Sequence, residues 1–147
     1  MPSVLYTAST FSHILNFHLP YLRRFRELGW QVEVACGGPV RDIPFADGAV
    51  SLPLEKKMSS PANFQAASQL RAMVIRQQYD LIILDPPAFA KHRAALHNAL
   101  KGYTRLNVKG LQRIKHGGIL FTFSCSQVVN KQDFRNAVFT AAAQSGR

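Results

Sequence analysis

The feature that most constrains the fold is the run Leu81-Ile82-Ile83-Leu84, which is followed at once by Asp85 and two prolines. A strand without alternating polar residues is typical of a parallel sheet that is covered on both faces. Pro86 and Pro87 lack the backbone N–H that a sheet ladder needs, so the strand must end at Asp85. The run therefore predicts a central strand whose carboxyl end carries an acidic side chain.

The rest of the chain alternates between strand and helix patterns. Further β-prone runs lie at residues 4–8, 31–35, 49–54 and 119–123, with helical periodicity after most of them. This alternation predicts one doubly wound, Rossmann-like α/β domain over residues 1–147. We expect three layers around a mainly parallel five-stranded sheet of order 3-2-1-4-5, with right-handed crossovers.

Two of the expected helices begin with proline in the first turn. The helix after Pro20 is predicted to bury Tyr21, Leu22, Phe25 and Leu28, and the helix that Ser60 caps is predicted to bury Phe64, Ala67, Leu70 and Val74.

Ligands bind doubly wound sheets beyond the carboxyl ends of the strands, where the strand order reverses. Residues 7–17, 85–89 and 124–128 are expected to converge there.

Length and composition exclude several classes of protein. A chain of 147 residues with 47% hydrophobic content is long enough for one core and too short for two ordinary domains. It contains no apolar run of about 18 residues and no secretory leader pattern, so we predict a cytoplasmic protein without a membrane span. Cys36 and Cys125 are too few for a disulfide framework, and no metal-ligand spacing surrounds either of them.

The positive charge is concentrated in the second half. The net charge is +10, and no acidic residue lies between Asp85 and Asp133. A basic row in this stretch repeats at every fourth position and consists of Lys101, Arg105, Lys109 and Arg113. On an unbroken helix these cations share one face, which is either a weak RNA-binding surface or a solvated outer face.

Asp85 and Cys125 are the residues best suited to chemistry. A carboxylate at a strand exit can accept hydrogen bonds from a planar base, or it can cap the next turn. A cysteine after the next strand and just before a helix is exposed to backbone N–H groups that favour a thiolate, although a lone cysteine is also a common inert core residue. Both alternatives stay open on the residues alone.

The second half resembles a known enzyme family. The segments Tyr79 to Phe89, Gly102-Tyr103 and Gly117 to Ser126 are similar to class I S-adenosylmethionine-dependent ribosomal RNA methyltransferases that make 5-methylcytosine. The resemblance covers residues 79–147. It implies that Cys125 is the nucleophile and that Asp85 holds the base, with substrate contacts from Pro86, Pro87, Phe89, Ser124, Lys101 and Arg105.

The first half resembles a different family. Residues 4–80, and above all Ser12 to Leu22, Ile43-Pro44-Phe45 and Gln69 to Ile82, are similar to the N-terminal domain of GT-B glycosyltransferases of the family 4 type. In that family this domain contacts the acceptor, while most of the sugar-nucleotide site lies in the other domain. His13 and His18 are then either acceptor-site residues or structural histidines.

The two halves do not supply one common site. A methyl-donor pocket needs a glycine-rich turn after the first strand and an acidic residue after the second, whereas this chain has residues 7–12 without glycine and Ala35-Cys36-Gly37-Gly38 without a carboxylate. We predict a chimera joined near residues 79–84, with a glycosyltransferase-like half at 1–80 and a methyltransferase-like half at 81–147. In this interpretation Asp85 and Cys125 are vestigial, no native activity is intact and no cofactor is bound.

Three alternatives remain, and one further prediction concerns assembly. The chain is otherwise an S-adenosylmethionine-dependent RNA cytosine-C5 methyltransferase, a glycosyltransferase acceptor-binding module, or a basic RNA-binding domain. Independently of these, the apolar strand at 119–123 is expected at the edge of the sheet. Because an exposed edge strand invites pairing with another chain, the sequence predicts a homodimer.

Overall fold

A single parallel sheet forms the centre of the protein. The computed structural model describes residues 1–54 and 61–146. The strands are β1 (Ser3–Ala8), β2 (Gln31–Gly37), β3 (Gly48–Leu52), β4 (Leu81–Asp85) and β5 (Ile119–Thr122). Every neighbouring pair is parallel and the order is β3-β2-β1-β4-β5. The predicted Rossmann-like fold and strand order are confirmed.

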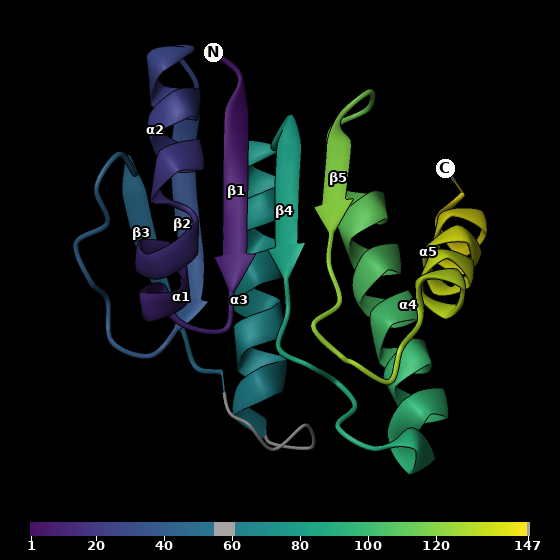
Figure 1. Cartoon of the computed structure of the whole chain (residues 1–147). Helices are drawn as coiled ribbons and strands as arrows, with labels where there is room; N and C mark the ends of the chain where they lie inside the picture. The colour runs from purple at the N-terminus through teal and green to yellow at the C-terminus, as the bar shows by residue number, and fades with distance from the viewer. Residues whose placement is uncertain (55–60, 147) are drawn as a thin grey trace.

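Helices cover both faces of this sheet. They are α1 (Phe11–Phe17), α2 (Leu19–Glu27), α3 (Pro61–Gln77), the short 3₁₀ helix η1 (Arg93–Ala95), α4 (Leu96–Arg113) and α5 (Lys131–Ser145). Figure 1 shows α1 and α2 in front of the sheet, α3 and α4 behind it, and α5 beside α4. Of the helices described, none is both long and apolar enough to cross a membrane.

Alternating residues of the central strands fill the two core layers. Val4 and Tyr6 of β1 pack with Leu22 of α2, whereas Leu5 between them packs with residues of α3 such as Val74. Successive side chains of a strand point to opposite faces, so a strand covered on both sides must be apolar throughout. This requirement explains the uninterrupted apolar run in β4.

Some residues assigned to the core from periodicity are exposed. Phe64 is 74% exposed, and Ala67 is also exposed, because α3 turns Ala66, Met73 and Val74 toward the sheet. The same correction applies to Tyr21 of α2 and to Leu28, which follows its last residue; they are 60% and 54% exposed. Ser60, the predicted cap of α3, lies outside the described residues.

Among the described residues, no helix covers the front face of β5 (Figure 1). Ile119 and Phe121 are 58% and 52% exposed, and their register partners in β4 are Leu81 and Ile83, which belong to the layer beneath α1 and α2. Leu120, between them, packs on the opposite face against the layer beneath α3 and α4. The sequence predicted exposure at 119–123 from the position of the strand at the edge. The structure adds that one face of β5 is uncovered as well.

Gly118 allows the turn before β5 to pack closely against the start of β4. A Cβ atom at this position would lie 2.9 Å from the Asp80 carbonyl oxygen, 2.9 Å from the Lys115 carbonyl oxygen and 2.8 Å from Ile114 Cγ1. Because two of these neighbours are backbone atoms, we expect Gly118→Ala to lower the free energy of unfolding by about 1–3 kcal/mol, measured by urea denaturation.

Gly48→Ala is the matched control. A Cβ atom at Gly48 would meet only Glu33 Cγ at 3.8 Å, an ordinary van der Waals distance. We expect its effect to stay within about 0.5 kcal/mol, the range of most surface substitutions. Equal losses in the two variants would show that close packing at Gly118 is not the cause.

Candidate functional site

The carboxyl ends of β1, β4 and β5 bring together loops from both halves of the chain. In the register of the sheet, Ala8 lies opposite Asp85, and Leu84 lies opposite Thr122. The loop from β1 into α1, the Asp-Pro-Pro segment after β4 and the Ser-Cys-Ser segment after β5 therefore start side by side. This agrees with the predicted convergence of residues 7–17, 85–89 and 124–128.

Asp85 is the centre of this edge. His13 Nε2 lies 2.6 Å from Asp85 Oδ2, and His18 Nε2 lies 3.3 Å from the same oxygen. The other oxygen, Oδ1, is 3.8 Å from Cys125 Sγ. The side chain of Asp85 is only 11% exposed, so these groups form most of its immediate surroundings. The sequence identified all four residues but did not predict that the histidines contact Asp85.

A break between two helices positions the histidines. Thr10 caps α1 by accepting a hydrogen bond from the His13 backbone N–H, and α1 ends at Phe17. His18 is the single residue between α1 and α2, with φ −112° and ψ −10°. Its ring packs edge-on against Tyr6 of β1, with the ring centroids 5.6 Å apart. The sequence pattern predicts no helix at residues 11–17, because a seven-residue helix gives little periodic signal.

Cys125 does not have the surroundings of an activated nucleophile. Burial raises the pKa of its thiol, and the negative charge and hydrogen bond of Asp85 raise it further. The expected helix N-terminus is not adjacent, because α5 begins at Lys131 and its cap is Asn130. The sequence prediction that backbone N–H groups of a following helix favour the thiolate is therefore wrong.

A buried polar network holds the two second-half loops together. Ser126 Oγ lies 2.9 Å from the Tyr103 hydroxyl and accepts a hydrogen bond from the Ala90 N–H at 3.1 Å. Phe89 stacks on Tyr103 with ring centroids 4.5 Å apart. A Cβ atom at Gly102 would lie 3.0 Å from the Phe89 ring, which explains the glycine beside Tyr103. Phe89 is thus a packing residue in this structure.

The other predicted substrate-binding residues lie at the surface or at its border. Pro86 is half-buried and Pro87 is exposed, while Ser124 Oγ accepts a hydrogen bond from the Ser126 N–H. Lys101 and Arg105 are exposed on α4, which is unbroken from Leu96 to Arg113. The helix therefore does place the predicted basic row on one face.

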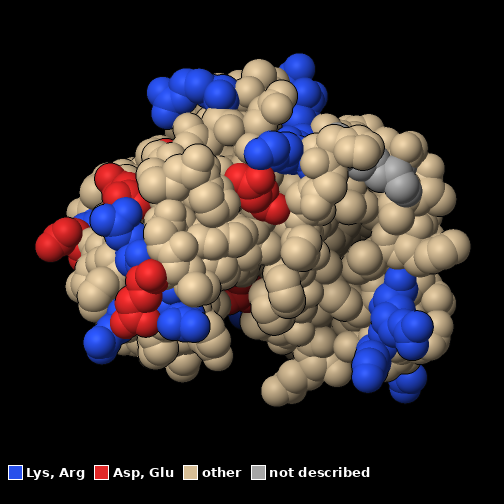
Figure 2. Space-filling model, turned by 90° about the horizontal axis from the view of Figure 1, so that it is seen from above, with Lys and Arg blue, Asp and Glu red and all other residues tan. Residues whose placement is uncertain are grey.

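Charge is unevenly distributed over the molecule. Figure 2 shows acidic side chains at the left, on the side of α2 and β3, and others near the centre, while the lower right in this view carries Lys and Arg without acidic neighbours. On the acidic side, Arg23 and Arg24 pair with Glu27, and Arg26 pairs with Asp47. The arginines of α2 are therefore partly neutralised.

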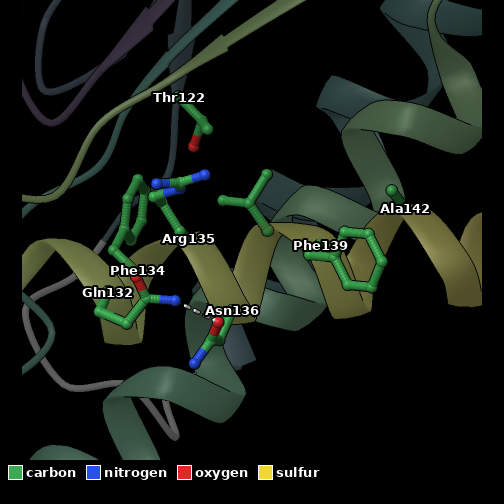
Figure 3. A pocket seen from close by; sticks show the side chains of 8 residues that line it. Thr122, Gln132, Phe134, Arg135, Asn136, Phe139 and Ala142 are labelled. Carbon is green, nitrogen blue, oxygen red and sulfur yellow. Dashed lines mark hydrogen bonds between the residues drawn. The ribbon is translucent and has the colours of Figure 1, made fainter.

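The two described cavities lie away from Asp85. The larger one, about 570 Å³, lies between Thr122 of β5 and one face of α5 (Figure 3). Its α5 lining includes Phe134, Val138 and Phe139, with Arg135 among them. The smaller one, about 260 Å³, is lined by residues of 40–49. Neither is lined by Cys125 or by the histidines.

Comparison with curated proteins finds partial similarity to ribosomal RNA methyltransferases. The chain is 42% identical over 71 residues to the ribosomal RNA large subunit methyltransferase I of Alteromonas mediterranea, which is 48% of this chain and 18% of that protein. It is 45% identical over 69 residues to the ribosomal RNA large subunit methyltransferase of Deinococcus radiodurans, covering 47% and 17%. For the corresponding methyltransferase I of Escherichia coli O1:K1 the values are 37% over 71 residues, 48% and 18%. The chain thus spans less than a fifth of these relatives.

A second comparison matches a different kind of protein over a longer stretch. The model of the family described as glycosyl transferase 4-like matches residues 3–106, from β1 into α4. The match continues past the predicted junction at 79–84. Similarity to two kinds of enzyme supports a two-part mosaic. Because the family model covers more than half of the 147 residues, the chain belongs to the glycosyl transferase 4-like family.

Proposed function

We propose that this chain is a folded mosaic of a glycosyltransferase-like and a methyltransferase-like half, and that neither parental active site is intact in it. The observation that carries the proposal is the contact of His13 and His18 with the carboxylate of Asp85. In the resemblance to RNA methyltransferases, that carboxylate holds the target base. Here two histidines from the glycosyltransferase-like half lie within hydrogen-bond distance of its Oδ2 atom.

The surroundings of Cys125 support the same conclusion. A thiol nucleophile reacts as the thiolate, and a raised pKa reduces the thiolate fraction at neutral pH. The neighbour that contributes to the shift is Asp85, whose negative charge disfavours a second negative charge beside it. Both residues of the inherited pair are thus poorly suited to covalent catalysis in this arrangement.

The ends of β1 and β2 pack directly on each other where a methyl donor would need room. A Cβ atom at Gly37, the last residue of β2, would lie 2.7 Å from the Ser9 carbonyl oxygen in the turn after β1. The turn itself leads through Thr10 straight into α1. A Rossmann-type cofactor approaches the backbone of a glycine-rich turn at this position, so this packing opposes binding of S-adenosylmethionine.

RNA binding through α4 is a second candidate function, and a specific observation favours it. Lys101, Arg105 and Lys109 are exposed, and no acidic residue lies on α4. Uncompensated cations on one helical face bind a phosphate backbone by releasing its counterions. The methyltransferase and acceptor-binding alternatives lack a comparable observation in the described site.

Self-association through β5 is a further proposal. Ile119 and Phe121 expose apolar surface on a strand that has a β-strand neighbour on one side only. A twofold axis would pair two copies of β5 antiparallel, which satisfies both unpaired edges and brings the exposed apolar side chains of the two strands side by side. The occupant that this surface fits is therefore a second copy of the same chain.

The first prediction concerns methyl-donor binding and covalent attack. We expect isothermal titration with S-adenosylmethionine to give no saturable binding in the micromolar range, because the turn after β1 has no glycine and packs closely on the end of β2. We also expect no adduct between Cys125 and RNA containing 5-fluorocytosine. The ribosomal RNA large subunit methyltransferase I of Escherichia coli O1:K1, titrated in parallel, is the positive control for donor binding. Micromolar donor binding that is lost in Asp85→Asn would falsify the proposal.

The second prediction concerns RNA. The triple variant Lys101→Gln, Arg105→Gln and Lys109→Gln should bind a fluorescent RNA hairpin more weakly than the unaltered chain. In a plot of the logarithm of the RNA association constant against the logarithm of the salt concentration, the slope should become less negative by about 0.7–0.9 for each phosphate that the variant no longer neutralises. Anisotropy titrations at several salt concentrations measure both effects.

A second triple variant separates the basic row from net charge. Arg23→Gln, Arg24→Gln and Arg26→Gln removes the same charge from α2, where these arginines have acidic partners. We expect this control to keep most of the affinity. An equal decrease in affinity in both triple variants would mean that total charge, and not α4, governs binding.

The third prediction concerns assembly. Sedimentation velocity should show concentration-dependent dimers, and Ile119→Lys with Phe121→Lys should shift the protein to monomers. Val40→Lys with Phe64→Lys is the matched control, since these side chains are 57% and 74% exposed elsewhere on the surface. A strictly monomeric unaltered protein at high concentration contradicts the proposal.

A further inference from the structure

His13, His18 and Asp85 form a compact group of metal-binding side chains. One ligand atom from each residue can be chosen so that all three lie within 4.8 Å of one another. The histidines come from α1 and from the α1–α2 break, and the carboxylate comes from the end of β4. The set therefore depends on the pairing of β1 with β4.

The ligand types and distances suit zinc. Zinc binds imidazole nitrogen and carboxylate oxygen at about 2.0–2.2 Å, which places neighbouring ligand atoms of a tetrahedral site about 3.3 Å apart. His18 Nε2 and Asp85 Oδ2 are already 3.3 Å apart, and His13 Nε2 is 2.6 Å from the same oxygen. A small outward movement of the His13 ring would bring this pair to the required separation.

The site is held in place and is also accessible to an ion. The side chains of His13, His18 and Asp85 are 32%, 15% and 11% exposed, so solvent reaches the group from the His13 side. The two imidazole rings pack against each other with centroids 5.3 Å apart, and His18 also packs on Tyr6. Metal binding would therefore require little further ordering of the two histidine side chains.

We infer that His13, His18 and Asp85 constitute a Zn²⁺ site with three protein ligands and one open coordination position. Zinc takes the Nε2 lone pair of each histidine, any proton on that nitrogen moves to Nδ1 or to solvent, and coordination takes the place of the two hydrogen bonds. Cys125 Sγ lies 3.8 Å from the other carboxylate oxygen and is not one of the three ligands. The site joins the two halves and does not depend on either parental activity.

The test uses Co²⁺ as a spectroscopic probe and Zn²⁺ as the competitor. The full chain, freed of metal by a chelator, is titrated with Co²⁺ and followed by its visible absorption. We expect one equivalent to give the intense bands of a four- or five-coordinate site, and Zn²⁺ to abolish them. His13→Ala and His18→Ala should each weaken binding by more than about 100-fold, the upper end of what removal of an outer-shell partner costs.

Matched variants locate the site. His97→Ala and His116→Ala remove exposed histidines on or after α4 and should leave the affinity unchanged. Cys125→Ser should also retain binding, and failure of that variant to bind would overturn the three-residue assignment. Absence of Co²⁺ binding in the unaltered chain, or full binding by the double variant His13→Ala with His18→Ala, would overturn the proposal itself.

A measurement on the unaltered chain guards against variants that do not fold. Diethyl pyrocarbonate modifies accessible histidines, and mass spectrometry of peptides identifies which ones have reacted. Zn²⁺ should protect His13 and His18 while His97 and His116 continue to react. Equal modification of all four with and without Zn²⁺ counts against the site regardless of how any variant behaves.

Discussion

The pairing of β1 with β4 is the constraint on which the rest of the structure depends. It joins the two halves at the centre of the sheet, in a register that runs from Val4 opposite Leu81 to Ala8 opposite Asp85. At one end the Ser3 N–H donates to Asp80 Oδ2 at 3.0 Å, and near the other Thr7 Oγ1 donates to the Ile83 carbonyl at 3.1 Å. A slip by one residue would turn every side chain of a strand to the opposite face, so two buried layers fix this register.

The same pairing decides which groups Asp85 meets. A carboxylate at the end of β4 lies beside whatever follows β1, and in this chain that segment carries His13 and His18. The chemistry of a side chain depends on its neighbours more than on the motif to which it belongs. The role of an Asp-Pro-Pro sequence therefore depends on the side chains that follow the neighbouring strand.

Much of the fold could be predicted from the sequence, because the buried strands are strongly apolar and the helices between them are long. The strand order followed from such patterns and is confirmed. The inward face of α3 was misassigned because Phe64 and Ala67 fit a helical spacing that the packing does not use. Periodicity identifies the buried face of a helix only when the polar side is distinct, and α3 is weakly amphipathic.

The candidate site was likewise predictable as a location but not as a set of contacts. The contact of His13 and His18 with Asp85 depends on the α1–α2 break, which no spacing rule predicts, and it joins residues that lie 67 and 72 positions apart in the chain.

A net charge of +10 does not argue against a cation site at this edge. Exposed charges farther than about 8 Å away are largely screened at physiological ionic strength, so the groups in direct contact decide the local preference. Among the ion pairs formed by the described residues, Asp80 pairs with Lys115 and Asp47 with Arg26, whereas Asp85 is matched only by histidines. Its negative charge has no permanent cation beside it, and neutral imidazoles with a carboxylate are ligands that zinc prefers. The net positive charge is therefore compatible with a cation site at Asp85, because distant Lys and Arg side chains are screened whereas the groups in contact with the carboxylate are not.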